Sequence, residues 1–197
     1  MKKMILCVAA LMALSPFASA QSGVPFSLYG GGLLSIPNSP DGFKDSYKNG
    51  YHLMLGIGLK TMPMMQLVGK AEYHRFGANY SGMSGLADGG ENIALYGVDL
   101  RFSPGAPAIP FRPFVFGGGG LASVRYNQFT GSDPLATAVA NAGLPTDESK
   151  FFYNFGGGLE VKFAPMVSLF AQVRYVNVST EGQKTSFIPI TVGLKIF

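Results

Sequence analysis

Residues 51–60 read YHLMLGIGLK, and apolar side chains occupy every second position of this stretch. One face would carry Tyr51, Leu53, Leu55, Ile57 and Leu59. The other face would carry His52, Met54, Gly56, Gly58 and Lys60. Because successive side chains of a strand point to opposite sides of a sheet, this alternation predicts a β-strand with one apolar face and not a helix.

The same period-two pattern recurs along the chain and predicts eight strands in all. The other segments are 25–36, 65–76, 92–102, 113–126, 151–163, 166–176 and 187–197. Short links (61–64, 103–110 and 164–165) alternate with long ones (37–49, 77–91, 127–150 and 180–186). This alternation is typical of an all-β, up-and-down antiparallel sheet whose short turns share one end. Most strands are about as long as the roughly 9–11 residues that a tilted strand needs to cross a bilayer.

The placement of charged side chains indicates which face of this sheet points inward. Hydrophobic residues make up 47% of the 197 residues and charged residues only 13%. The face opposite the apolar one carries Lys70, Glu72, Asp99, Arg101, Glu160, Lys162 and Arg174. In lipid every backbone polar group needs an internal partner, so strands can cross only as a closed barrel. We therefore predict an eight-stranded antiparallel transmembrane β-barrel with a charge network in its lumen and apolar side chains outside.

Aromatic residues are expected near both ends of the apolar face. Near the long loops they are Tyr51, Tyr73, Tyr126, Tyr153 and Tyr175, and near the short turns they are Phe102, Phe114 and Phe163. Two such girdles at the lipid interface are typical of outer-membrane barrels. The alternative is a soluble barrel or sandwich of the lipocalin type. That class would need a polar outer face and a Trp near the first strand, and the chain has no Trp.

The N-terminus has the pattern of an export signal. Lys2 and Lys3 precede the apolar stretch 4–14, and an Ala-Ser-Ala site follows at 18–20. This predicts a cleaved signal peptide at 1–20 and a barrel domain at 21–197 that begins at Gln21. The alternative is a short uncleaved anchor. The single Cys lies in the signal, so the mature chain needs no disulfide framework.

The export signal, the eight alternating strands, the short turns and the terminal Phe197 resemble the small outer-membrane β-barrel families that include the OmpA transmembrane domain, OmpX and the opacity proteins. The resemblance implies residence in the outer membrane of a Gram-negative-type bacterium, in contact with its lipids. It also implies that barrel-assembly machinery reads Phe197 as the C-terminal assembly signal. Here the apolar series is Ile196, Leu194, Val192 and Ile190, one residue out of phase with Phe197.

Two histidines are expected to face each other in the lumen. The turn after the second strand centres near Pro63, so opposing residue numbers should add up to 126 and His52 should pair with His74. With Glu72 these side chains are weak candidates for a metal site, which would need further ligands. The alternative interpretation is a hydrogen-bond network inside the barrel.

Enzymatic and nucleotide-binding patterns are weak. The runs Gly117–Gly120 and Gly156–Gly158 lack the Lys-Ser/Thr of a phosphate loop, so we interpret them as strand glycines. Some outer-membrane barrels act on lipid A through a lipid-facing His and Ser two residues apart, but His52 is followed by Met54 and His74 by Phe76. Lys and Arg are scattered among opposite charges, which argues against a nucleic-acid partner.

These observations predict a non-enzymatic barrel with a structural or surface-interaction role and no cofactor. The alternatives are a narrow, porin-like channel for small or apolar solutes and, less favoured, a lipid A-modifying enzyme. The long loops could meet an extracellular ligand. Within one of them, Asp133-Pro134 followed by Leu135, Ala138 and Ala142 predicts a short helix over 133–143.

Overall fold

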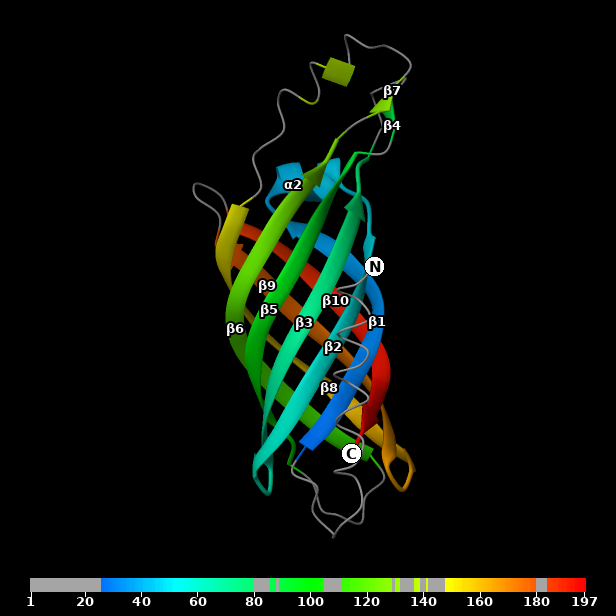
Figure 1. The fold of residues 1–197 in the computed structure, drawn as a ribbon, viewed down its shortest axis with the longest axis vertical. Helices are drawn as coiled ribbons and strands as arrows, with labels where there is room; N and C mark the ends of the chain where they lie inside the picture. The colour runs from blue at the N-terminus through cyan, green and yellow to red at the C-terminus, as the bar shows by residue number, and fades with distance from the viewer. Residues whose placement is uncertain are drawn as a thin grey trace, which may run out of the picture.

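Eight long antiparallel strands close into a barrel (Figure 1). The computed structural model describes residues 26–79, 86–87, 89–104, 111–128, 130–131, 137–138, 141, 148–179 and 184–197. The barrel strands are β1 (Phe26–Ser39), β2 (Gly50–Met62), β3 (Met65–Gly77), β5 (Gly90–Phe102), β6 (Phe111–Asn127), β8 (Glu148–Ala164), β9 (Val167–Ser179) and β10 (Lys184–Ile196). Each barrel strand pairs with its neighbour along the chain, and β1 pairs with β10 to close the sheet. The predicted eight-stranded up-and-down barrel is confirmed.

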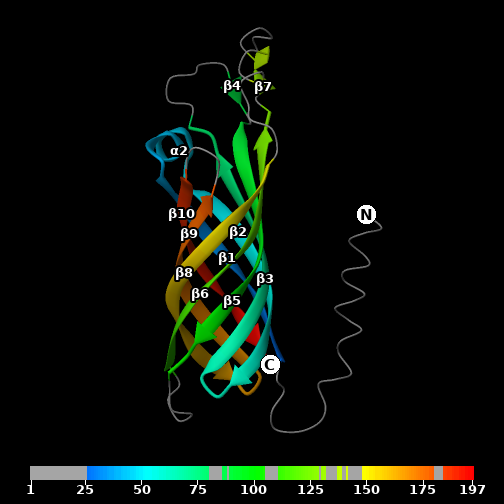
Figure 2. The same ribbon diagram turned by 90° about the vertical axis from the view of Figure 1, so that its left-hand side faces the viewer.

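The two ends of the barrel differ, as the link lengths predict. At the short-turn end, Pro63–Met64 and Pro165–Met166 form two-residue turns, because Met62 pairs with Met65 and Ala164 with Val167. Proline suits the second position of such turns because its φ is already fixed near the required value. At the long-loop end lie the helix α2 (Asp41–Ser46) and the strand pair β4 (Leu86–Ala87) and β7 (Thr130–Gly131), which stands beyond the barrel rim (Figure 2).

The register of β2 and β3 is the predicted one. His52 pairs with His74, Met54 with Glu72 and Gly56 with Lys70, so the paired numbers add up to 126. The glycine runs Gly117–Gly120 and Gly156–Gly158 lie within β6 and β8, as expected for strand glycines. Among the described residues, no helix is long and apolar enough to cross a membrane.

Apolar and aromatic side chains cover the outer wall. At the long-loop end, Tyr51, Tyr73 and Tyr153 are exposed, and Tyr175 packs outside against Phe155 with ring centroids 5.3 Å apart. At the short-turn end Phe102 and Phe163 are exposed. These six aromatics lie on the predicted face.

The predicted outward placement of Phe114 and Tyr126 is wrong. Phe114 is buried in the lumen beside Phe116, and Tyr126 packs against buried apolar residues inside the barrel. Glycines on the neighbouring strand make this possible. A Cβ on Gly158 would lie 2.5 Å from the ring of Phe114, and one on Gly156 would lie 2.8 Å from the ring of Phe116. Only residues without side chains leave space for these two rings inside so narrow a barrel.

Two predicted segments fall outside this description. The signal peptide over 1–20 lies outside the described residues, and so does most of the loop helix over 133–143.

Candidate functional site: the barrel lumen

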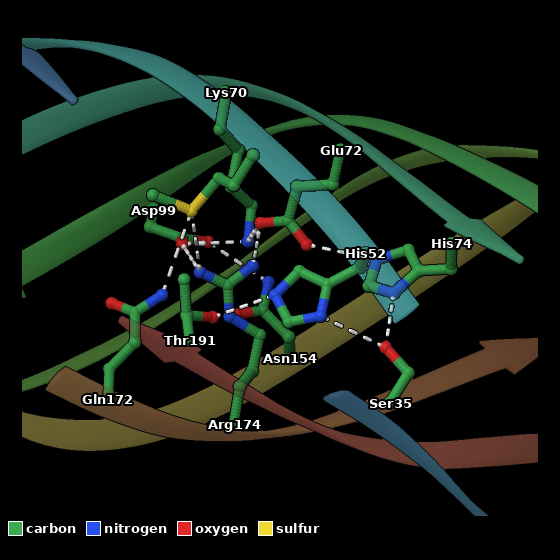
Figure 3. A network of polar contacts seen from close by, with 11 residues as sticks. Ser35, His52, Lys70, Glu72, His74, Asp99, Asn154, Gln172, Arg174 and Thr191 are labelled. Carbon is green, nitrogen blue, oxygen red and sulfur yellow. Dashed lines mark hydrogen bonds and ion pairs between the residues drawn. The ribbon is translucent and has the colours of Figure 1, made fainter. Parts of the chain in front are cut away.

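A charged cluster occupies the middle of the lumen (Figure 3). Its members, which come from β3, β5 and β9, are Lys70, Glu72, Asp99 and Arg174. Lys70 Nζ lies 2.7 Å from Asp99 Oδ2 and 3.5 Å from Glu72 Oε1. Arg174 contacts both carboxylates, and its Nη2 lies 3.4 Å from Asp99 Oδ2. All four side chains are buried, and two cations face two carboxylates, so the charges compensate each other.

A row of polar side chains extends this cluster toward the long-loop end. The rings of His52 and His74 stack with their centroids 5.0 Å apart. Ser35 Oγ lies 3.2 Å from His52 Nδ1 and 2.8 Å from His74 Nδ1. The outer nitrogens also have partners: His52 Nε2 lies 3.0 Å from Thr191 Oγ1, and His74 Nε2 lies 3.2 Å from Glu72 Oε2.

The partners of each ring nitrogen assign one direction to this chain of hydrogen bonds. An ionised Glu72 only accepts, so His74 Nε2–H donates to it and His74 Nδ1 accepts from the Ser35 hydroxyl. Ser35 Oγ then accepts from His52 Nδ1–H, and His52 Nε2 accepts from Thr191. Every nitrogen is satisfied with both imidazoles neutral. The chain therefore joins four neighbouring strands, β3, β2, β1 and β10, along one side of the lumen.

This arrangement resembles a hydrolytic triad and a metal site, but it has the geometry of neither. Ser35, His74 and Glu72 share the connectivity of a hydroxyl, a base and a carboxylate. Ser35 and His74 have no exposed surface, and Ser35 also bonds to His52, so a substrate has no approach to the hydroxyl. Across the described ranges, no group of three or more His, Cys, Asp and Glu side chains is placed to hold a metal ion.

A second charged cluster lies nearer the short-turn end. Glu160 on β8 contacts Arg101 on β5, and its Oε1 lies 3.2 Å from Lys195 Nζ on β10. The guanidinium of Arg101 also lies 3.5 Å from the centre of the Phe114 ring, a cation–π contact. Lys195 is a member that the sequence interpretation missed. The sequence does contain the information needed to place it. Lys195 lies between Leu194 and Ile196, which belong to the apolar outer face of β10, so its side chain points to the opposite face, toward the lumen.

The predicted place of Lys162 in this network is wrong. Lys162 is exposed, two residues beyond Glu160 and next to the turn after β8. At that point the strand has passed the packed lumen, so the ammonium group lies in solvent. The terminal Phe197 lies close by: its N–H donates to the Met166 carbonyl at 3.1 Å, and Lys195 Nζ lies 4.7 Å from its ring centre.

The long-loop end of the lumen is apolar. We call these buried side chains the apolar plug: Phe43, Phe76, Ile93, Leu95, Ala122, Val124, Phe152, Val176, Val178 and Phe187. Phe43, on α2, packs edge-on against Phe76 with ring centroids 5.3 Å apart. Tyr47 pairs with Ala78 and packs against the plug, and burial, with a smaller contribution from Glu91, raises the pKa of its phenol. The helix α2 thus covers the mouth of the barrel.

A small cavity of about 20 Å³ lies between the two charged clusters. Its lining includes Lys70, Asp99, Arg101 and Arg174. A cavity of this size has room for about one water molecule. The lumen is thus filled at three levels, by the apolar plug, the central cluster with its histidine chain, and the second cluster with its aromatic rings.

The comparisons with known proteins agree with this architecture. Residues 4–195 match the model of the outer membrane protein beta-barrel domain family. The chain belongs to this family. No curated protein sequence matches it. Several solved barrel structures superpose on this one over most of their lengths.

Three solved structures illustrate this likeness. Neisserial surface protein A is 14% identical, with a TM-score of 0.63, covering 89% of this chain and 99% of that one. The attachment invasion locus protein Ail of Yersinia pestis is 16% identical, with a TM-score of 0.51 and coverage of 87% and 97%. The N-terminal β-barrel domain of Pseudomonas aeruginosa OprF is 14% identical, with a TM-score of 0.50 and coverage of 86% and 97%. At these identities the likeness shows the fold.

Proposed function

We propose that the protein is a non-enzymatic barrel of a Gram-negative outer membrane that acts at the cell surface through its long loops. The observation that carries this proposal is the filled lumen, in which buried ion pairs join strands across the barrel and α2 covers the mouth. Such a lumen stabilises the barrel and leaves little room for solute. The β4–β7 pair extends the β5–β6 ribbon past the rim, which presents the loops to partners outside the cell.

A conductance measurement separates this proposal from a narrow channel. We expect the purified, folded protein to give no current steps above background in a planar bilayer, because three packed levels block the lumen. A heat-dependent gel shift of the same preparation verifies that the barrel is folded. Discrete steps that scale with the amount of protein would contradict the closed lumen and favour the channel.

Localisation gives a second test. The protein is expected in the outer-membrane fraction, with Gln21 as the first residue of the mature chain, because the export signal ends at Ala20. It should migrate more slowly on gels after heating, when the barrel unfolds. Recovery in the soluble periplasmic fraction would contradict the membrane assignment.

The enzyme alternative is tested separately. We propose no hydrolytic role for Ser35 and His74, because both are buried within the barrel wall and lumen. Mass spectrometry of lipid A from cells with and without expression should therefore give the same species. Loss of an acyl chain upon expression would overturn the non-enzymatic assignment.

A further inference from the structure

The small cavity between the two charged clusters has three cations in its lining. Lys70, Arg101 and Arg174 supply them, and Asp99 is the one carboxylate among the described residues that line it. This carboxylate is already engaged on both oxygens. Its Oδ2 lies 2.7 Å from Lys70 Nζ, and its Oδ1 accepts a hydrogen bond from Asn154 Nδ2 at 3.0 Å. The cavity therefore presents more positive than negative charge to an occupant.

The charge balance of the surrounding clusters has the same sign. The central cluster is neutral, but in the second cluster Arg101 and Lys195 share the carboxylate of Glu160. Arg112, which is half-buried, pairs with Glu160 in the register of β6 and β8 and adds to the positive side. Among the described side chains of these clusters, cations therefore outnumber carboxylates. Because buried charge is costly unless it is compensated, an anion taken up from solution would stabilise this arrangement.

The unused hydrogen-bonding capacity of the lining residues consists mostly of donors. Arg174 Nε is buried and has no hydrogen-bond partner among the described residues. Arg174 Nη2 and the Gln172 amide nitrogen lie 3.9 Å and 3.7 Å from the sulfur of Met54, which as a thioether is a weak acceptor (Figure 3). The nearby acceptor without a partner, Asn154 Oδ1, is not part of the lining. A water molecule has to donate hydrogen bonds as well as accept them, whereas a monatomic anion only accepts, so the donor surplus favours an anion.

We propose that this cavity binds one small monovalent anion, of the size of chloride, as a counter-ion inside the barrel. A chloride ion is only slightly larger than a water molecule, so it matches a cavity of about 20 Å³. Lys70, Arg101 and Arg174 would surround it, and its charge would balance the excess of cations. Polyatomic anions such as sulfate and gluconate are too large for this volume. The site lies in the middle of the lumen, so it is independent of the surface role proposed above.

Equilibrium unfolding by urea tests the site, because urea, unlike guanidinium chloride, supplies no chloride. The mature protein is unfolded reversibly in lipid vesicles at constant ionic strength, while sodium chloride replaces sodium gluconate. An ion that binds only the folded barrel stabilises it by mass action. Above the dissociation constant, each tenfold rise in chloride should therefore lower the unfolding equilibrium constant about tenfold, as expected for the uptake of one ion. An unfolding midpoint that is the same in chloride and in gluconate would overturn the site.

Three variants separate the cavity from general effects of salt, each verified as folded by its heat-dependent gel shift. Arg101→Met removes a cation from the lining and leaves Glu160 paired with Lys195, so it should lose the chloride dependence. Gln172→Met removes a neutral donor and should raise the chloride concentration needed by about tenfold, the effect of one hydrogen bond to an ion. Lys162→Gln, the matched control, removes an exposed cation outside the cavity and should behave as the wild type does. A chloride dependence that survives Arg101→Met, or that Lys162→Gln abolishes, would overturn the site.

Crystals of the wild type grown in sodium bromide give a direct measurement that needs no variant. Bromide takes the place of chloride and scatters anomalously. We expect one anomalous peak in the lumen between Lys70, Arg101 and Arg174. Density in the cavity without an anomalous signal would assign a water molecule to it and overturn the anion.

Discussion

Val98→Arg is expected to lower the free energy of unfolding in lipid vesicles by about 2–4 kcal/mol, the cost of an arginine at the bilayer midplane on the lipid face of a barrel. Val98 lies in the middle of β5 and is 47% exposed on the outer wall. Its outward neighbours on the strand, Tyr96 and Leu100, are also apolar and exposed. The measurement is reversible denaturant unfolding, with the change read from the midpoint at constant slope.

Phe102→Arg is the depth control for this experiment. Phe102 ends the same strand on the same outer face, at the short-turn end. A charge near the membrane–water interface costs only about 0–1 kcal/mol, so this variant should be much milder. If Val98→Arg and Phe102→Arg were both as stable as the wild type, hydrocarbon would not surround Val98. The transmembrane assignment would then fail.

Most of the fold could be predicted because each strand separates two environments. In β2 the exposed set from Tyr51 to Leu59 alternates with lumen residues such as His52 and Met54, so the phase can be read directly. The tight turn at Pro63 leaves a single register for β2 and β3, and this is why the His52–His74 pairing could be derived. Local sequence carries this information because strand period and turn length are local properties.

The phase of β6 could not be read in the same way. Gly117–Gly120 place no side chain on either face, and Phe114, Val115 and Phe116 are apolar on both. The orientation of Phe114 depends on Gly158, more than forty residues away in the chain. The apolar plug was missed for a similar reason: Phe76 and Phe187 face the lumen, and their partners come from distant strands and from α2.

The two charged clusters also depend on contacts between distant strands. Arg101 and Glu160 come from β5 and β8, and Lys195 comes from the last strand. Alternation alone placed Lys162 on the lumen face, but it could not show that the packed lumen ends before that residue. Two things therefore decide which charged side chains lie inside: how the barrel closes, and where each residue lies along the barrel axis.

Removing Glu72 is expected to cause the largest loss of stability. Glu72 contacts Lys70, Arg174 and His74, and its side chain is buried. Glu72→Ala leaves two buried cations facing one carboxylate and takes the acceptor from His74. Breaking a buried ion pair in this way costs about 3–5 kcal/mol. The measurement is again reversible unfolding in vesicles.

A compensating variant separates charge from packing in this cluster. Lys70→Met removes the cation that Glu72 helps to neutralise, so the double variant Glu72→Gln/Lys70→Met restores a balance of one cation and one carboxylate. It should be more stable than Glu72→Gln alone, with a coupling energy of about 0.5–3 kcal/mol, the range measured for residues in one network. Lys162→Ala, at an exposed position, should change stability by no more than about 0.5 kcal/mol. If Glu72→Ala is as stable as Lys162→Ala, water must solvate the central cations, and the narrow channel becomes the better account of the lumen.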